Sequence, residues 1–361
     1  MKRLKREEGI RISIDAKMGV QITELLTINE IELSDLNGKV VAIDAFNQLY
    51  QFLTTIRSPD GAPLSDSHGQ ITSHLVGLFA RTVNLLEKGI KLVFIFDGKA
   101  PELKAAERER RMLAKIDAQQ RYDLALKEKN IDEMKKYAGR TTRLTDDLVK
   151  EAKELINLFG IPIIQAPSEA EAQAAFLVKN KEAYAVASQD ADSLLFGAPK
   201  LIRNLSVTGK RKLPGKMSYD IVKPTMIDLS ENLENIGIDN NQLIVLGILV
   251  GTDFNPGGIK GIGPKNALKL VKKYGTDFEK LFEEVKWSEF YDFSWKEVFE
   301  IFKNIPITKD YELKWKSMDK EGIIKLLHEK HDFSKERVEN SLNKLLKGTE
   351  KKQQKGLGDF I

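Results

Sequence analysis

KVVAID at residues 39–44 and IKLVFIFD at residues 90–97 are the two stretches that decide the fold. Both are short apolar runs rich in β-branched residues, which is typical of strands buried inside a parallel sheet. A helical pattern over residues 72–87 lies between them, so the sequence predicts a strand–helix–strand unit. Each run ends in an aspartate, Asp44 or Asp97. Sites in open α/β sheets form at the carboxyl ends of strands, so both carboxylates are candidate site residues.

The same alternation continues along the chain. Helices are expected over residues 148–159 and 168–178, each followed by a short apolar strand, at 161–164 and 183–187. Residues 102–138 contain neither glycine nor proline, which predicts a long helical segment, broken near Asn130. We therefore predict an α/β fold, with a mostly parallel central sheet flanked by helices and an inserted helical segment.

Composition narrows the function classes. The 361 residues carry a formal net charge of +4, which is too small to indicate a nucleic-acid partner by itself. The absence of cysteine excludes disulfide bonds and thiolate zinc sites. The longest strongly apolar run, residues 243–250, is too short to span a membrane, and residues 1–17 lack the apolar segment of a secretory signal. We expect a cytoplasmic protein with no membrane partner.

Seven carboxylates follow strands or begin helices. They are Asp44, Asp97, Glu169, Glu171, Asp190, Asp192 and Asp253. Taken singly, they have ordinary alternatives, because Ser168 with Glu171 fits a capping box and Asp190 could cap the helix that follows it. Gathered at one end of a sheet, they would repel one another unless cations neutralised them. Oxygen-only ligands suit Mg²⁺ or Mn²⁺, and two such ions can hydrolyse a phosphodiester.

Basic and glycine-rich segments are the candidate phosphate contacts. Lys104 and Arg111 lie seven residues apart on one helix face, close in sequence to Asp97, where they could steady a phosphate. A solvated charged face is the alternative for most basic residues nearby. GIKGIGPK at residues 258–265 resembles a helix-hairpin-helix turn, in which glycines let backbone N–H groups approach a phosphate. An ordinary glycine-rich connection is the alternative here.

Six motifs in this order resemble those of the flap endonucleases of archaea and eukaryotes, in the structure-specific 5′ nuclease family. They are VAIDAFNQLYQFL, TSHLVGLF, VFIFDGKAPELK, GIPIIQAPSEAEAQAA, ASQDADSLLFG and GTDFNPGGIKGIGPKNAL, and the resemblance runs from residue 18 to residue 361. The chain departs from the family pattern at Ala100, where proline is common, and at Ile361, where an aromatic residue is frequent.

The resemblance implies metal ligands and phosphate contacts. Asp44, Asp97, Glu169 and Glu171 would serve mainly a first Mg²⁺ ion, whereas Asp190, Asp192 and Asp253 would serve a second, and Mn²⁺ could substitute. Lys104 and Arg111 would touch the scissile phosphate. Further DNA contacts would involve Tyr50, which stacks near the cleaved nucleotide, Arg57 and Thr72, which line a pocket for a one-nucleotide 3′ flap, and also Glu169, Gly251, Asp253, Gly261, Gly263 and Lys265. The helix-hairpin-helix turn would also hold a K⁺ ion.

The C-terminus resembles the peptide by which replication proteins bind a ring-shaped sliding clamp. Its matching residues are Gln354, Leu357, Phe360 and Ile361, whose spacing suits one side of a tight helical turn. A frayed tail with chance apolar residues is the alternative. The residues from 347 onward are rich in lysine, glutamine and glycine, which predicts a flexible tail.

We expect residues 18–115 and 146–275 to form the nuclease body, which includes the helix-hairpin-helix. Residues 116–145 would complete the helical arch, residues 276–346 a C-terminal helical region, and residues 347–361 the tail. Residues 1–17 precede Met18, near which chains of this family usually begin. We expect these seventeen residues to lie outside the working enzyme; a basic, flexible extension that adds DNA affinity is the alternative.

The expected activity is Mg²⁺-dependent hydrolysis near the base of a 5′ flap, with 5′–3′ exonuclease activity. The resemblance implies roles in Okazaki fragment maturation and long-patch base excision repair, for a monomer that is associated with the nucleoid if the cell is prokaryotic. One rival is a sister 5′ exonuclease or bubble-cutting repair nuclease, which the compact arch and clamp-like tail disfavour. The other is a non-catalytic branched-DNA binding protein, which the full carboxylate set disfavours.

Overall fold

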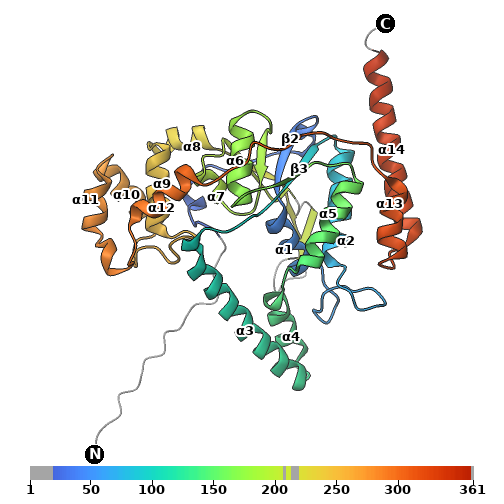
Figure 1. The fold of residues 1–361 in the computed structure, drawn as a ribbon, viewed down its shortest axis with the longest axis horizontal. Helices are drawn as coiled ribbons and strands as arrows, with labels where there is room; N and C mark the ends of the chain where they lie inside the picture. Colours follow the sequence, from blue (N-terminus) through green and yellow to red (C-terminus); the bar gives the residue numbers. More distant parts are fainter. Residues whose placement is uncertain (1–18, 206–208, 213–218, 359–361) are drawn as a thin grey trace, which may run out of the picture.

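A seven-stranded sheet forms the centre of the molecule (Figure 1). The computed structural model describes residues 19–205, 209–212 and 219–358, without the side chains of 206–221 and of 349–358. The strand order is β1-β9-β6-β5-β2-β3-β4. These strands are β1 (Asn29–Glu30), β2 (Val40–Asp44), β3 (Lys91–Phe96), β4 (Ile163–Gln165), β5 (Ala185–Ala187), β6 (Lys200–Arg203) and β9 (Thr225–Asp228).

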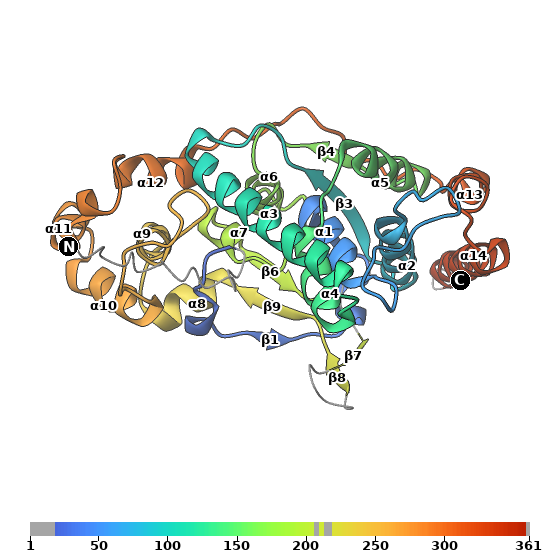
Figure 2. The same ribbon diagram turned by 90° about the horizontal axis from the view of Figure 1, so that it is seen from below.

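The middle of the sheet is parallel, which confirms the predicted fold class. β2 pairs in parallel with β3 and with β5, and β4 and β6 extend the parallel region on the two sides. β6, β9 and β1 were not predicted, and the last two add an antiparallel edge. All three are short and lack a long apolar run, so the sequence carries little signal for them. A separate hairpin of β7 (Gly209–Lys212) and β8 (Tyr219–Val222) projects beside this edge (Figure 2).

Alternation along the strands divides the interior into two cores. In β3, Leu92, Phe94 and Phe96 face one core, whereas Val93 and Ile95 face the other. The first core lies under α1 (Ala45–Thr55), α2 (Ser73–Glu87), α5 (Asp146–Leu158), α13 (Lys320–Ile324) and α14 (Lys335–Gly358). The second lies under α6 (Ala170–Lys179), α7 (Asp192–Leu195), α8 (Leu229–Ile236), α9 (Asn240–Val250), α10 (Pro264–Tyr274), α11 (Phe278–Glu284) and α12 (Trp295–Asn304). Helices on both faces leave the ends of the parallel strands as the accessible part of the sheet.

Two helices extend from the body beside the sheet. α3 (Ala105–Lys127) and α4 (Ile131–Ala138) pack against each other and project away from the other helices (Figures 1 and 2). Asn130 separates them, and its side chain accepts a hydrogen bond from the N–H of Glu133 at 3.2 Å. The helical segment is therefore broken at the predicted residue, because Asn130 caps the second helix.

A tight glycine-rich loop joins α9 to α10, as predicted. Gly251 ends α9 with a φ of +109°, and a Cβ atom there would lie 2.6 Å from the backbone nitrogen of Gly258. Only glycine fits such a close approach of two backbone segments. Pro264 occupies the first turn of α10, where its missing N–H costs no hydrogen bond.

The two ends of the chain differ in what the structure describes. α14 continues to Gly358, so the helix enters the tail that was predicted to be flexible. The physical reason is that residues 347–355 contain no proline and consist mainly of lysine and glutamine, which favour helix. Residues 1–17 and the apolar pair Phe360 and Ile361 lie outside the described residues. Within the described ranges, no helix is long and apolar enough to cross a bilayer.

Candidate active site

The fold brings the seven predicted carboxylates to the carboxyl edge of the parallel strands. Asp44 is the last residue of β2, Asp97 follows β3, and Asp190 and Asp192 follow β5. Glu169 and Glu171 lie at the start of α6, and Asp253 follows α9. Charge repulsion links the cluster directly, since Asp97 and Asp190 act on Asp44, Glu169 acts on Asp97, and Asp253 acts on Asp192.

Backbone N–H groups hold three of these side chains, and two of these donors belong to distant segments. Asp97 Oδ1 accepts from the N–H of Ala170 at 2.6 Å, and Asp192 Oδ1 accepts from the N–H of Val20 at 2.6 Å. Asp44 Oδ1 accepts from the N–H of Asn47 at 3.0 Å. Each carboxylate keeps a second oxygen that these bonds do not use, so the side chains are oriented while part of their acceptor capacity stays available.

Asp44 is the N-cap of α1, but the two predicted capping alternatives at α6 and α7 are wrong. Glu169, not Ser168, is the N-cap of α6, and no side chain caps that helix start. Glu171 Oε1 instead accepts from the hydroxyl of Ser188, 3.2 Å away, on the neighbouring strand end. Ala191, not Asp190, is the N-cap of α7. Carboxylates that make no helix cap of their own need another explanation for their position.

Burial and mutual repulsion make the carboxylates hard to ionise together. These effects raise the pKa of Asp97 and of Asp190 to about 6, and the pKa of Asp192 to about 8. They also raise the pKa values of Asp44 and Glu171 well above their ordinary range. Burial is the largest cause of each shift and repulsion between the carboxylates adds to it, and bound cations would offset both effects.

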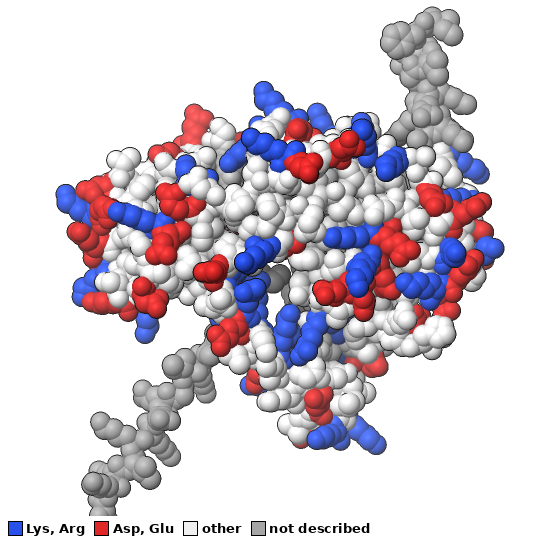
Figure 3. All heavy atoms as spheres, viewed as in Figure 1, with Lys and Arg blue, Asp and Glu red and all other residues white. Residues whose placement is uncertain are grey.

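Two cations reach into the carboxylate cluster, Lys104 at the N-cap of α3 and Arg111 within α3. Lys104 Nζ pairs with Glu169 and lies 3.3 Å from Asp253 Oδ2, while Arg111 Nη2 donates to Asp253 Oδ1 at 2.7 Å. Burial lowers the pKa of Lys104, but Glu169 and Asp253 outweigh burial and raise it above its ordinary value. Figure 3 shows Lys and Arg side chains beside the hollow where α3 leaves the body.

Sequence analysis missed several residues that support this arrangement. Glu107, which is 4% exposed, binds both Arg110 Nε and Arg111 Nε at 2.6 Å and so fixes the direction of the Arg111 guanidinium. The hydroxyl of Thr252 donates to Asn255 Oδ1 at 2.7 Å within the loop that carries Asp253. The spacing of four residues between Glu107 and Arg111 was the only sequence signal for these contacts.

The residues predicted to contact DNA differ in how exposed they are. Tyr50 is half-buried, and Lys115 Nζ lies 5.0 Å from its ring centroid. Arg57 Nη1 donates to the carbonyl of Gly61 at 2.8 Å, and Thr72 is only 5% exposed. Gly251 has a packing role in its loop, whereas three residues of the following turn are exposed, namely Gly261, Gly263 and Lys265. This exposed turn is where a phosphate could approach the backbone.

The donor chemistry of the cluster fits hard cations. Across the described segments, no three His, Asp or Glu side chains are arranged to hold one metal ion. Lys104 interacts electrostatically with all seven carboxylates. It forms ion pairs with Glu169 and Asp253, and its positive charge lowers the pKa values of the other five. Carboxylate oxygens are nevertheless the ligands that Mg²⁺ and Mn²⁺ prefer.

Comparison with known proteins gives one consistent family. The XPG N-terminal domain matches residues 16–118 and the XPG I-region matches residues 160–253, and these ranges contain all seven carboxylates. Flap endonuclease 1 of Thermococcus onnurineus is 55% identical over 344 residues, which cover 95% of this chain and 99% of that protein. Flap endonuclease 1 of Pyrococcus abyssi is 53% identical, with coverages of 95% and 98%.

A solved structure shows the same relationship. Flap endonuclease-1 from Methanococcus jannaschii is 41% identical to this chain and matches it with a TM-score of 0.73, covering 92% of this chain and 100% of that one. Sequence identity and fold agree over nearly the whole length. The chain therefore belongs to the flap endonucleases of the XPG family.

Proposed function

We propose that this protein hydrolyses a phosphodiester near the base of 5′ flaps in branched DNA, using Mg²⁺ bound by its seven carboxylates. The observation that supports the proposal most strongly is the cluster of seven carboxylates at the sheet edge, where Lys104 and Arg111 pair with Glu169 and Asp253. Relatives that are more than half identical bear the name flap endonuclease, which supports the choice of substrate.

The metal ligands divide into two sets. Asp44, Asp97, Glu169 and Glu171 would hold one Mg²⁺ ion, and Asp190, Asp192 and Asp253 a second. When bound, the ions supply Lewis acidity and a water whose pKa is lowered toward neutrality. Mn²⁺ takes the same oxygen ligands, so we expect it to substitute.

Lys104, which precedes α3, and Arg111, which lies in α3, would bind the scissile phosphate. Without DNA, Lys104 and Arg111 pair with Glu169 and Asp253, and these pairs hold both side chains at the carboxylate cluster. Bound metal ions would compete for the carboxylates of these pairs, and a phosphate would compete for the cations. Lys104 and Arg111 could therefore exchange a carboxylate for a phosphate oxygen. Fixed cations stabilise the negative charge that develops during phosphoryl transfer. Glu107 keeps Arg111 pointed at the site.

DNA on either side of the cut would be held by separate elements. The exposed turn with Gly261, Gly263 and Lys265 precedes and begins α10, where N–H groups and the helix start attract a phosphate, and we expect this turn also to hold K⁺. Tyr50 would stack on a base near the cut. Arg57 and Thr72 are proposed to line a pocket for a 3′ flap, and α3 and α4 would form the arch that the free 5′ end enters.

The cellular role follows from the same chemistry. Cutting 5′ flaps, together with 5′–3′ exonuclease activity, would serve Okazaki fragment maturation and long-patch base excision repair. Recruitment by a sliding clamp would use the tail, in which Gln354 and Leu357 lie in α14 while Phe360 and Ile361 lie outside the described residues. We propose that the protein works as a monomer on DNA in the cytoplasm.

A substrate comparison tests this proposal. Equal amounts of a 5′-flap, a bubble and a nicked duplex are incubated with the protein, with Mg²⁺ or with EDTA. We expect rapid cleavage of the flap at its base, slower cleavage of the other two, and none in EDTA. Faster cleavage of the bubble or of the nicked duplex would instead identify a sister nuclease, and binding without cleavage in Mg²⁺ would identify a DNA-binding protein.

A further inference from the structure

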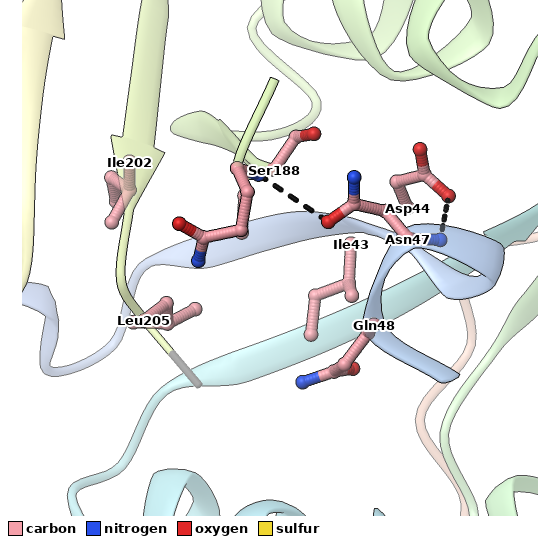
Figure 4. Close-up of a pocket in the computed structure, with 9 residues that line it drawn as sticks. Ile43, Asp44, Asn47, Gln48, Ser188, Ile202 and Leu205 are labelled. Atoms are coloured by element: carbon pink, nitrogen blue, oxygen red, sulfur yellow. Dashed lines mark hydrogen bonds between the residues drawn. The ribbon is translucent and has the colours of Figure 1, made fainter. Parts of the chain in front are cut away.

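We infer that Asn47 is a positioning residue, which holds the Asp190 carboxylate in the orientation that a metal ion requires. Asn47 lies in the first turn of α1 beside a small pocket between the ends of β2, β5 and β6 (Figure 4). The inference rests on the proposed function, since it assigns a role to a residue that contacts two of the proposed metal ligands.

Asn47 joins three segments through its backbone and its amide. Its side-chain Nδ2 donates to Asp190 Oδ2 at 2.6 Å, and its Oδ1 accepts from the N–H of Gln189 at 3.4 Å. Its own N–H donates to Asp44 Oδ1. The backbone N–H of Gln189 can only donate, so the amide oxygen must face it and the amide nitrogen must face the carboxylate. The orientation of the amide is therefore determined by its partners.

A neutral donor suits this position better than a cation. Lys104 and Arg111 neutralise the carboxylates that they contact, and they compete with any metal ion for them. The amide of Asn47 instead orients Asp190 while leaving its negative charge and its second oxygen in place. Groups that orient metal ligands in this way typically contribute about 10- to 100-fold to metal affinity.

Gln48 provides a matched control. It follows Asn47 in α1 and lines the same pocket, and it is 6% exposed (Figure 4). Its Oε1 is buried and accepts no hydrogen bond within the described part of the chain. A change of Gln48 to leucine therefore alters the same pocket by the same kind of substitution, without removing a donor from a carboxylate.

The test measures Mn²⁺ binding by electron paramagnetic resonance, which reports free Mn²⁺ directly and needs no cleavage. Asn47→Leu keeps the backbone N–H that binds Asp44 and removes both bonds of the side-chain amide, the one to Asp190 and the one from the N–H of Gln189. We expect Asn47→Leu to weaken Mn²⁺ binding by about 10- to 100-fold, and Gln48→Leu to leave it unchanged. The concentration of Mn²⁺ that gives half-maximal flap cleavage should rise in parallel, while flap binding stays the same.

Two further measurements keep the inference separate from a folding defect. Thermal melting of the metal-free proteins shows whether each variant is folded, and Asn47→Ala replaces Asn47→Leu if leucine prevents folding. In an Asp190→Asn background, removing the Asn47 amide should have no further effect on Mn²⁺ binding. A folded Asn47 variant that binds Mn²⁺ as tightly as the parent would overturn the inference alone, whereas a parent that binds no Mn²⁺ would overturn the proposed function as well.

Discussion

At the scale of single residues, Lys104 and Arg111 contribute positive charge where the proposed reaction develops negative charge. Either change to alanine should slow single-turnover flap cleavage by about 100- to 1,000-fold, which is the usual effect of losing one fixed donor at such a site. Arg121→Ala is the matched control, because Arg121 lies on α3 with Arg111 but pairs with Asp117 and donates to the hydroxyl of Tyr137 instead of contacting the carboxylate cluster. Rates within twofold of the parent for Lys104→Ala and Arg111→Ala would show that these side chains are surface charges.

Asp192 makes a second prediction, on the stability of the metal-free protein. Burial, Asp253 and Asp190 raise its pKa from 3.8 to about 8 in the folded protein. A raised pKa stabilises the fold fully below the unfolded value and loses that contribution as the pH rises through the folded value. Asp192→Asn should therefore be more stable than the parent at pH 8 in EDTA, and this advantage should vanish near pH 4.

Urea denaturation at several pH values measures this difference directly. Comparing the variant with the parent removes the contributions of all other titrating groups. Saturating Mg²⁺ should reduce or reverse the advantage of Asp192→Asn, because metal binding stabilises the parent. An advantage of the same size at pH 4 and at pH 8 would mean that the ionisation of Asp192 is not its cause.

The residues of the site were predictable from sequence only in part. The carboxylates and Lys104 stand at strand ends and helix starts, so residue type and position together identify them. The groups that donate to these carboxylates, such as the N–H groups of Val20 and Ala170, belong to the backbone. Every residue except proline has such a group, so the sequence does not indicate which one donates. The contact of Asn47 with Asp190 was not predicted either, because an asparagine near a helix start usually indicates a helix cap.

At the scale of elements, a buried ionic network joins α2, α5 and the turn before α14. Glu151 on α5 lies 3.3 Å from His74 Nε2, 3.1 Å from Lys330 Nζ and 3.2 Å from His331 Nε2. His331 Nδ1 lies 2.9 Å from Asp66 Oδ2, in the loop that precedes α2. His74 is therefore a packed residue of the interior that lies within ion-pair distance of Glu151.

This network predicts how stability changes in acid. Burial raises the pKa of Glu151, but its close contacts with His74 and Lys330 outweigh burial and lower the pKa from 4.5 to about 2. A lowered carboxylate pKa stabilises the fold above the unfolded value, and the contribution disappears as the pH falls through the folded value. Glu151→Gln should be less stable than the parent at pH 6, with the gap closing toward pH 2. A gap that is constant over this range would contradict the assignment.

Prediction of the elements succeeded where packing produces a periodic pattern. The strands at residues 40–44 and 91–96 and the helix α2 between them are buried on faces that the apolar spacing marks, whereas α1 was not predicted. The antiparallel edge of β9 and β1 depends on backbone pairing with residues far along the chain, which side-chain spacing does not encode. The extension of α14 into the tail depends on helix propensity, which was given too little weight beside the lysine-rich composition.

At the scale of the whole molecule, the tail is predicted to connect the enzyme to a sliding clamp. Phe360→Ala, or deletion of residues 354–361, should leave flap cleavage by the isolated protein unchanged and remove its stimulation by the clamp. The two apolar residues at the end of a polar tail are the reason, since such residues commonly anchor an interface. Calorimetry that finds the same clamp affinity for the truncated protein would show that the main contact lies elsewhere.

The carboxylate cluster is proposed to cut the DNA, whereas other surfaces of the protein are proposed to bind it. Single-turnover cleavage of a 5′ flap in Mg²⁺ by Asp192→Ala and Asp97→Ala, with flap binding measured in parallel, tests this division most directly. Asp147→Ala serves as the control, because that side chain is 86% exposed on α5. We predict that cleavage is abolished in both cluster variants while flap affinity stays near that of the parent and of the control. Near-normal cleavage by Asp192→Ala in Mg²⁺ would contradict the account.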